Sequence, residues 1–165
     1  MVTRNRVLAA LGLLLALWGL WYFFPTRERQ VRRQFKSLAA WASKDGEEGS
    51  LASLQIAREA RDYFSDPCQW TAESYELAGN VSINEITQYV FAARTRMDRL
   101  SVKFYDLMVD FTPEGQARVT ATVRIVGVGK GGDALNDTRE LKCTLAKEDG
   151  RWRFKTVTLV QVLKK

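Results

Sequence analysis

The chain has 165 residues, with 25 lysines and arginines against 19 acidic residues, and it contains no histidine. The excess positive charge lies within residues 1–36, and the neutral remainder lacks the basic surface that binds nucleic acid. Histidine is the commonest metal ligand and proton shuttle, and two cysteines alone are too few for a zinc site. We therefore predict no nucleic-acid partner, no metal site and no cofactor.

Residues 7–24 form an unbroken apolar run with basic residues on both sides. As a helix this run would measure about 27 Å, close to the hydrocarbon thickness of a bilayer. It ends in Trp and Phe side chains, whereas a signal-peptide cleavage site has small residues. We therefore predict an uncleaved transmembrane anchor at residues 1–25 and a single-pass protein of the cell membrane.

The charges around this run leave the side of the membrane open. The count of Lys and Arg is higher after the run than before it, which favours a cytoplasmic domain. A very short basic N-terminus, however, usually stays inside while the chain behind it is exported. We favour the second alternative, a periplasmic or exported domain, on the assumption of a bacterial source.

Residues 26–45 form the predicted juxtamembrane segment and first helix. Apolar side chains recur at helical spacing over residues 27–43, starting with Val31 and Phe35. The same helix carries cations that we predict to form a lipid-facing basic collar, although a helix with solvated arginines explains them equally well. The collar residues are Arg27, Arg29, Arg32, Arg33 and Lys36.

Residues 46–165 form the predicted α+β domain. A second helix is expected at residues 51–64 and a short strand at residues 69–77. Ser82 and Glu85 have the spacing of a capping box, which predicts the start of a third helix. That helix is expected to bury Ile86, Val90, Ala93 and Met97.

From Leu100 onward the apolar period changes from that of a helix to that of a strand. Alternation continues over residues 100–111 with a slip near Tyr105, which predicts a β-bulge. Further strands are expected at residues 117–125, around residues 141–145 and from Trp152 onward, the last with a second bulge. Turns are expected at residues 112–115 and 148–150, and a long hairpin loop at residues 129–137.

The order helix, helix, short strand, capped helix and four long antiparallel strands resembles the nuclear transport factor 2-like (SnoaL-like) superfamily over about residues 27–163. The local features that carry the resemblance are the terminal hairpin EDGRWRFKTVTLVQV and the helix start SINEI. The resemblance implies a cone-shaped α+β fold, with helices packed on a curled antiparallel sheet and a cavity at the wide end. Members include steroid isomerases, dehydratases, binding proteins and scaffolds, so the fold alone does not choose a function.

We predict that the anchor presents this domain as a ligand-binding, protein-binding or scaffolding module, with a protein partner or second copy on the sheet face. The alternative is a membrane-tethered isomerase or dehydratase that uses an Asp base and a Tyr donor inside the cone. Asp98, Asp106 and Asp110 are available by type, but we expect the last two on the solvent face and assign no catalytic residue. Candidate ligand-contacting residues, for which core packing is the competing explanation, are Trp70, Tyr75, Tyr89 and Tyr105.

Two other patterns have structural explanations. Residues 127–132 are rich in glycine, like a phosphate-binding loop, but they lie between two strands instead of before a helix, which favours a turn. Cys68 and Cys143 could form a disulfide in an oxidising compartment. We favour two buried free cysteines, because free cysteine is among the most buried residue types.

Overall fold

The computed structural model describes residues 26–46, 52–72 and 77–161, so the predicted anchor at residues 1–25 lies outside the described residues. Within those three ranges, no helix combines the length and the apolar character needed to span a membrane. The chain divides into two compact units, Met1–Gln30 and Val31–Lys165, and the second unit contains the whole described sheet.

The described part of the chain is a mixed α+β structure. Its strands form one sheet in the order β1-β4-β5-β6-β7-β2-β3. Strands β4 to β7 are antiparallel neighbours, as predicted, whereas β2 runs parallel to β7. In chain order the elements are α2 (Arg27–Ala42), β1 (Lys44–Asp45), α3 (Ala52–Tyr63), β2 (Phe64–Ala72), β3 (Leu77–Val81), α4 (Ile83–Arg96), β4 (Met97–Phe111), β5 (Ala117–Gly129), β6 (Ala134–Glu148) and β7 (Arg151–Gln161).

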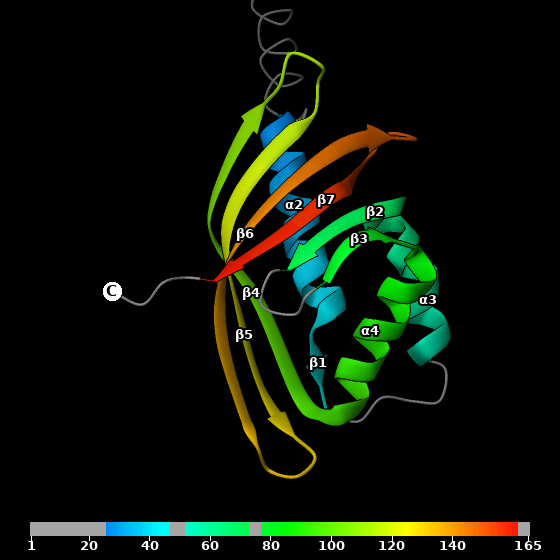
Figure 1. Ribbon diagram of the computed structural model, residues 1–165, viewed down its shortest axis with the longest axis vertical. Coiled ribbons are helices and arrows are strands. Elements are labelled where there is room, and N and C mark those ends of the chain that lie inside the picture. The colour runs from blue at the N-terminus through cyan, green and yellow to red at the C-terminus, as the bar shows by residue number, and fades with distance from the viewer. Residues whose placement is uncertain (1–25, 47–51, 73–76, 162–165) are drawn as a thin grey trace, which may run out of the picture. The chain divides into compact units, whose positions relative to one another are not determined.

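The long strands are bent, and the helices pack against one face of the sheet, which we call the inner face (Figure 1). The alternation predicted for β5 is confirmed, since Ala117, Val119, Ala121 and Val123 are buried on this face. The intervening side chains Arg118 and Arg124 are exposed on the opposite, outer face. The sheet therefore has one apolar face and one solvated face, as antiparallel sheets commonly do.

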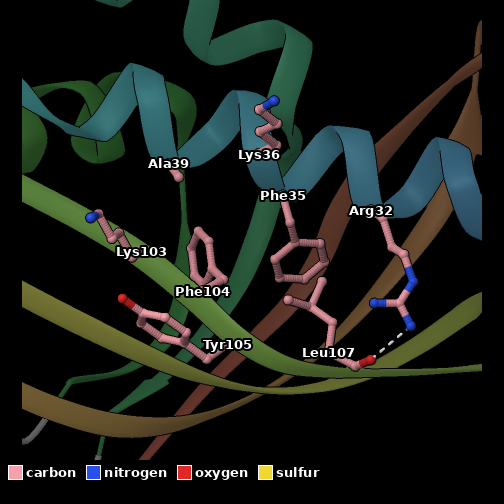
Figure 2. A pocket seen from close by; sticks show the side chains of 8 residues that line it. All are labelled: Arg32, Phe35, Lys36, Ala39, Lys103, Phe104, Tyr105 and Leu107. Carbon is pink, nitrogen blue, oxygen red and sulfur yellow. Dashed lines mark hydrogen bonds between the residues drawn. The ribbon is translucent and has the colours of Figure 1, made fainter.

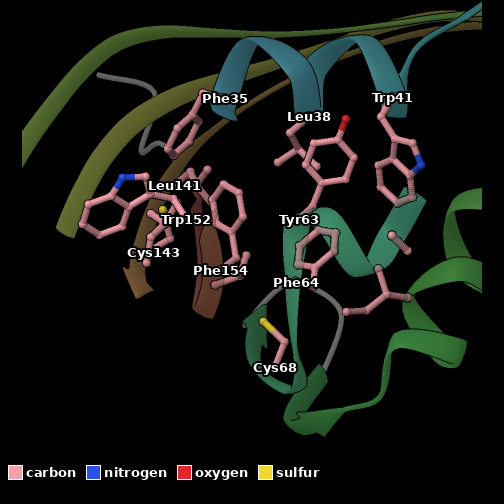
Figure 3. Packing of buried hydrophobic residues seen from close by; sticks show 14 of the residues in the cluster. Phe35, Leu38, Trp41, Tyr63, Phe64, Cys68, Leu141, Cys143, Trp152 and Phe154 are labelled. Carbon is pink, nitrogen blue, oxygen red and sulfur yellow. The ribbon is translucent and has the colours of Figure 1, made fainter. Parts of the chain in front are cut away.

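Aromatic side chains from α2, α3, β2 and β7 meet in the core (Figure 3), and Phe104 of β4 packs against them. The Phe35 ring packs edge-on against Phe104 and Phe154, with ring centroids 5.1 Å apart in both pairs. Trp41, the second-last residue of α2, packs against Tyr63. Helix α2 therefore belongs to the core, and the compact unit begins at Val31, before the boundary predicted at residue 46.

The short strand predicted at residues 69–77 is wrong in its extent. The chain enters β2 directly after α3, and β2 and β3 form an antiparallel pair in its place. Phe64 pairs with Phe154 of β7, and after a register shift the pairing resumes at Gln69. The irregular stretch around Pro67 interrupts the alternation, so the apolar pattern there does not mark where the strand begins.

The capping box predicted at the start of α4 is confirmed. The Glu85 backbone N–H donates to the Ser82 hydroxyl at 3.3 Å, and the Ser82 backbone N–H donates to the Glu85 carboxylate at 2.8 Å. The buried face of this helix was predicted less well: Ile86 is buried, but Ala93 is exposed and Met97 already begins β4. Helix α4 buries side chains mainly in its first turns.

Both predicted bulges are confirmed. The β4–β5 register shifts between Tyr105 and Met108, and Asp106 adopts φ 53° there. The β6–β7 register shifts next to Lys155. These bulges change which side chains of β4 and β7 point inward, and both strands stay in the sheet along their full length.

The glycine-rich segment after β5 is a hairpin connection, and β6 follows it directly, so the phosphate-loop explanation does not apply. The connection is shorter than predicted, because the Gly129 N–H donates to the Asp133 carbonyl at 2.8 Å and β6 starts at Ala134. Gly127 is required for packing, since a Cβ at this position would lie 2.9 Å from the Arg99 carbonyl oxygen.

Candidate functional site

An open groove of about 280 Å³ lies between α2 and β4 (Figure 2). Its apolar lining comes from Phe35 and Ala39 of α2 and from Phe104 and Leu107 of β4. Its other lining residues are Tyr105 and three cations, Arg32, Lys36 and Lys103. No acidic side chain is among the described residues that line this groove.

The groove exists because β4 lacks a strand partner along most of one edge. Strand β1 pairs only with Arg99 and Leu100. Beyond them, the Val102 N–H donates to the Ser43 hydroxyl at 2.9 Å, and the Arg32 guanidinium donates to the Leu107 carbonyl at 3.0 Å. Side chains from α2 and from the residue after it thus partly occupy the edge, which otherwise would be open to pairing with another strand.

The cations of the groove come from two elements. Arg32 and Lys36 lie one turn apart on α2, a spacing that puts both on the same helix face. Lys103 lies on β4, where it pairs with Arg124 of β5, and its ammonium group points away from that of Lys36 (Figure 2). Neither lysine forms an ion pair with any described residue. Of the predicted basic collar, only Arg32 and Lys36 line the groove, whereas Arg27, Arg29 and Arg33 are also exposed on α2 but do not.

The four aromatic candidates for ligand contact are not brought together. Trp70 is half-buried and packs on Phe64 in the core, with ring centroids 6.1 Å apart. Tyr89 is 54% exposed on α4, and Tyr105 is 43% exposed beside the groove. Tyr75 lies outside the described residues. Among the candidates with a described position, only Tyr105 lines the groove.

The carboxylates predicted for the alternative, catalytic hypothesis lie on the surface. Asp98, Asp106 and Asp110 are all exposed. Tyr105 and Asp106 do lie together, but in a shallow depression across β4, β5 and β6 that also includes Arg124. Because Arg124 points outward, this acid–tyrosine pair occupies the outer face of the sheet, not its inner face.

Sequence reasoning missed a charged pair on the inner face. The Arg139 Nε donates to both carboxylate oxygens of Asp137, at 2.9 and 3.1 Å. Both residues are in the inward phase of β6, because they pair with Ile125 and Val123 of β5. Continuing the alternation of residues 141–145 backward along the chain would have found both residues, but the loop predicted at residues 129–137 included Asp137.

Both cysteines are free and buried, in agreement with the favoured sequence interpretation. Burial raises the pKa of the Cys68 thiol to about 11, and the neighbouring Trp70 side chain partly opposes this effect. Burial likewise raises the pKa of the Cys143 thiol to about 12, with a smaller contribution from Cys68. Both thiols are therefore protonated at neutral pH, which is unsuited to nucleophilic attack. In the ranges that the structure describes, no cluster of three or more acidic, cysteine or histidine side chains could hold a metal ion.

No protein-family model and no curated protein sequence matches the chain. Solved structures do match. A protein from Kribbella flavida has a TM-score of 0.69 at 15% identity, covering 85% of this chain and 93% of its own. A structure from Novosphingobium aromaticivorans, named as a scytalone dehydratase, has a TM-score of 0.64 at 16% identity, covering 82% of this chain and 84% of its own.

A third structure carries the name of the fold. It is a nuclear transport factor 2-like protein from Cytophaga hutchinsonii, with a TM-score of 0.61 at 12% identity, covering 83% of this chain and 99% of its own. Likeness at such low identity speaks for the fold alone. The domain therefore has the nuclear transport factor 2-like fold that the order of its elements predicted.

Proposed function

We propose that this chain is a single-pass membrane protein whose domain is a binding module without chemistry of its own. The observation that carries the proposal is the groove between α2 and β4, where an apolar lining meets three cations. This groove lies on the first described helix after the apolar run at residues 7–24. Its composition suits an amphiphilic, anionic partner better than it suits a reaction.

Several features argue against the alternative, a tethered isomerase or dehydratase. The acid–tyrosine pair of Asp106 and Tyr105 is open to solvent on the outer face. The inner-face carboxylate of Asp137 is engaged by Arg139, so it is poorly placed to take a proton from a substrate. One structural neighbour is named as a scytalone dehydratase, but at 16% identity its activity does not transfer to this chain.

The anchor rests on the sequence and is tested directly by membrane extraction of the full chain. Wild-type protein should stay in the membrane pellet at alkaline pH in sodium carbonate. The double variant Leu14→Arg, Leu17→Arg should be released, because each charge near the centre of a span costs about 3 kcal/mol. The matched variant Leu14→Ile, Leu17→Ile should behave as wild type, and release of the wild-type chain by carbonate would refute the anchor.

We place the domain on the exported side of the membrane, because a very short basic N-terminus usually stays inside while the chain behind it is exported. A C-terminal alkaline phosphatase fusion tests this side, since the enzyme is active only after export. High activity is expected. An inactive fusion, present at the same level by immunoblot, would put the domain in the cytoplasm.

The outer sheet face is the proposed contact for a protein partner or for a second copy of the chain. Val126 and Val128 are 39% and 43% exposed there, and exposed apolar patches on soluble domains commonly mark interfaces. Sedimentation equilibrium of the full chain in detergent should show self-association that the double variant Val126→Lys, Val128→Lys abolishes. If the wild type is monomeric at all concentrations, a second copy is not the partner.

A further inference from the structure

We infer that the groove between α2 and β4 binds one acyl chain of an anionic phospholipid, with the lipid phosphate held by Lys103 and with Lys36 adding positive charge nearby. This inference rests on the proposed membrane anchoring and names the partner that the groove would accept. It extends the basic collar of α2 by one cation from the sheet and by an apolar surface that the collar itself lacks.

The chemistry of the groove specifies an anion with an apolar tail. Phe35, Phe104 and Leu107 offer carbon surface, while Lys36 and Lys103 supply charge without an acidic neighbour in the groove. A zwitterionic lipid would bring an ammonium group toward these cations, so charge complementarity favours a lipid with net negative charge. The amphiphile would thus match both parts of the lining.

The size of the groove favours a single chain. Its volume of about 280 Å³ is below the ~300–1,000 Å³ of pockets that enclose a drug-sized ligand, and it is open to solvent along one side. A compact molecule would remain largely exposed there. An elongated chain can lie along α2 with only part of its length in contact.

A peptide strand is a poorer occupant, although β4 presents an edge here. The Val102 N–H is bonded to the Ser43 hydroxyl, and the Leu107 carbonyl accepts from Arg32. An added strand would have to break these hydrogen bonds before forming its own. An acyl chain can bind without breaking these hydrogen bonds, because it contacts only the apolar side chains of the groove.

The bilayer is the nearest source of such a chain. Lys36 follows Phe24, the last residue of the apolar run, by 12 residues (36 − 24). The nine steps from Arg27 to Lys36 lie in α2 and rise about 14 Å, and the three steps before them span at most about 11 Å. Phospholipids of the anchoring membrane therefore lie within reach of the groove at high local concentration. A soluble amphiphile would have to compete with them.

The test uses the full chain in phosphatidylcholine vesicles that contain a small fraction of phosphatidylglycerol with a photoactivatable diazirine on one acyl chain. After illumination, trypsin yields a peptide of residues 104–118, which includes Phe104 and Leu107. We expect label on this peptide as well as on the peptide of residues 7–27, which serves as the internal measure of bilayer contact.

Two variants separate the headgroup from the chain. Lys103→Glu removes the tryptic site before Phe104, so its β4 peptide covers residues 100–118. We expect at least about fivefold less label on that peptide, because each charge at a membrane surface is worth about 1 kcal/mol and the reversal changes two charges. Ala39→Leu should reduce it by filling the groove without changing any charge. The matched control is Lys147→Glu, the same charge reversal at an exposed position of β6 outside the groove, and it should leave the label unchanged.

The failures of the two proposals give different results. If the peptide of residues 7–27 takes up no label, the anchor itself is refuted. If that peptide is labelled but residues 104–118 are not, only the groove proposal falls. Equal labelling of residues 104–118 by diazirine phosphatidylcholine, or no effect of both Lys103→Glu and Ala39→Leu, would also overturn it.

Discussion

The Val102 backbone N–H donates a hydrogen bond to the Ser43 hydroxyl at 2.9 Å, joining the edge of the sheet to the end of a helix. The same hydroxyl donates to the Ala39 carbonyl in the last turn of α2, at 2.7 Å. The Ala39 carbonyl also accepts from the Ser43 backbone N–H at 3.0 Å, so the hydroxyl adds a second bond to it. The same short side chain satisfies an N–H that the sheet edge leaves without a strand. The position of α2 over β4, and hence the groove, depends on this contact.

Removing this hydroxyl should destabilise the domain. For a fragment of residues 26–165, we expect Ser43→Ala to lower the free energy of unfolding by about 1–3 kcal/mol, the usual cost of leaving a partly buried donor unsatisfied. Urea denaturation measures the change. Ser101→Ala is the control, since the Ser101 side chain bonds to no described residue and its loss should cost no more than about 0.5 kcal/mol. Equal effects of the two variants would contradict the role of Ser43.

The register of β5 predicts a sharp contrast between neighbouring positions. Val119 is 2% exposed on the inner face, so Val119→Asp would bury an unpaired carboxylate and should unfold the domain. Arg118 is exposed on the outer face, so Arg118→Glu should change the unfolding free energy by no more than about 0.5 kcal/mol. Denaturation midpoints give the ranking. A greater loss of stability from Arg118→Glu than from Val119→Asp would show that the two faces of the strand are assigned the wrong way round.

Helix α2 sets the minimum length of a stable domain. The domain predicted at residues 46–165 leaves this helix out, but Val31 and Phe35 are completely buried, at 0% and 1% exposure. We now expect a fragment of residues 37–165 to lack a cooperative unfolding transition that a fragment of residues 26–165 shows. Within the longer fragment, Phe35→Ala should cost about 3–5 kcal/mol, while the exposed neighbour Lys36→Ala should have little effect. Identical transitions for the two fragments would contradict this assignment.

Local signals account for the parts of the fold that the sequence predicted well. The Ser82–Glu85 capping box involves groups three residues apart, so its pattern is visible without knowledge of the rest of the chain. The alternation in β5 is also local, because the polarity of each side chain in a half-buried strand indicates whether it lies on the buried or the solvated face. Even the bulge at Asp106 appeared as a change of phase within one strand.

Contacts between distant segments account for what was missed. The groove depends on Phe35 meeting Phe104, two residues in elements whose apolar patterns are each complete without the other. The parallel pairing of β2 with β7 likewise has no signal in either strand alone. Asp137 and Arg139 show a third cause. Polar residues on an inner face break the alternation by which strands are recognised, so Asp137 was assigned to the loop and its pairing with Arg139 was missed.

The two buried thiols should make the domain less stable in alkaline solution. Unfolding exposes Cys68 and Cys143 to water, where each titrates near its ordinary pKa of 9.0, while burial holds the native values at about 11 and 12. Between these limits the native state binds more protons than the unfolded state, so stability falls as pH rises. The thiol contribution is fully present below pH 9 and decreases above it, by at most about 1.4 kcal/mol per pH unit for each thiol.

The double variant Cys68→Ala, Cys143→Ala separates this effect from other alkaline titrations. Lysines and tyrosines ionise in the same range, but they are identical in the two proteins, so the difference between their stability curves isolates the thiols. We expect the variant to be less stable at pH 7, because the smaller side chains leave cavities, and to lose less stability between pH 9 and pH 11 than the wild type. Urea denaturation of the 26–165 fragment at successive pH values measures both curves. Parallel curves above pH 9 would mean that the thiols titrate alike in the folded and unfolded chains, and thus that they are not shielded from water as the structure indicates.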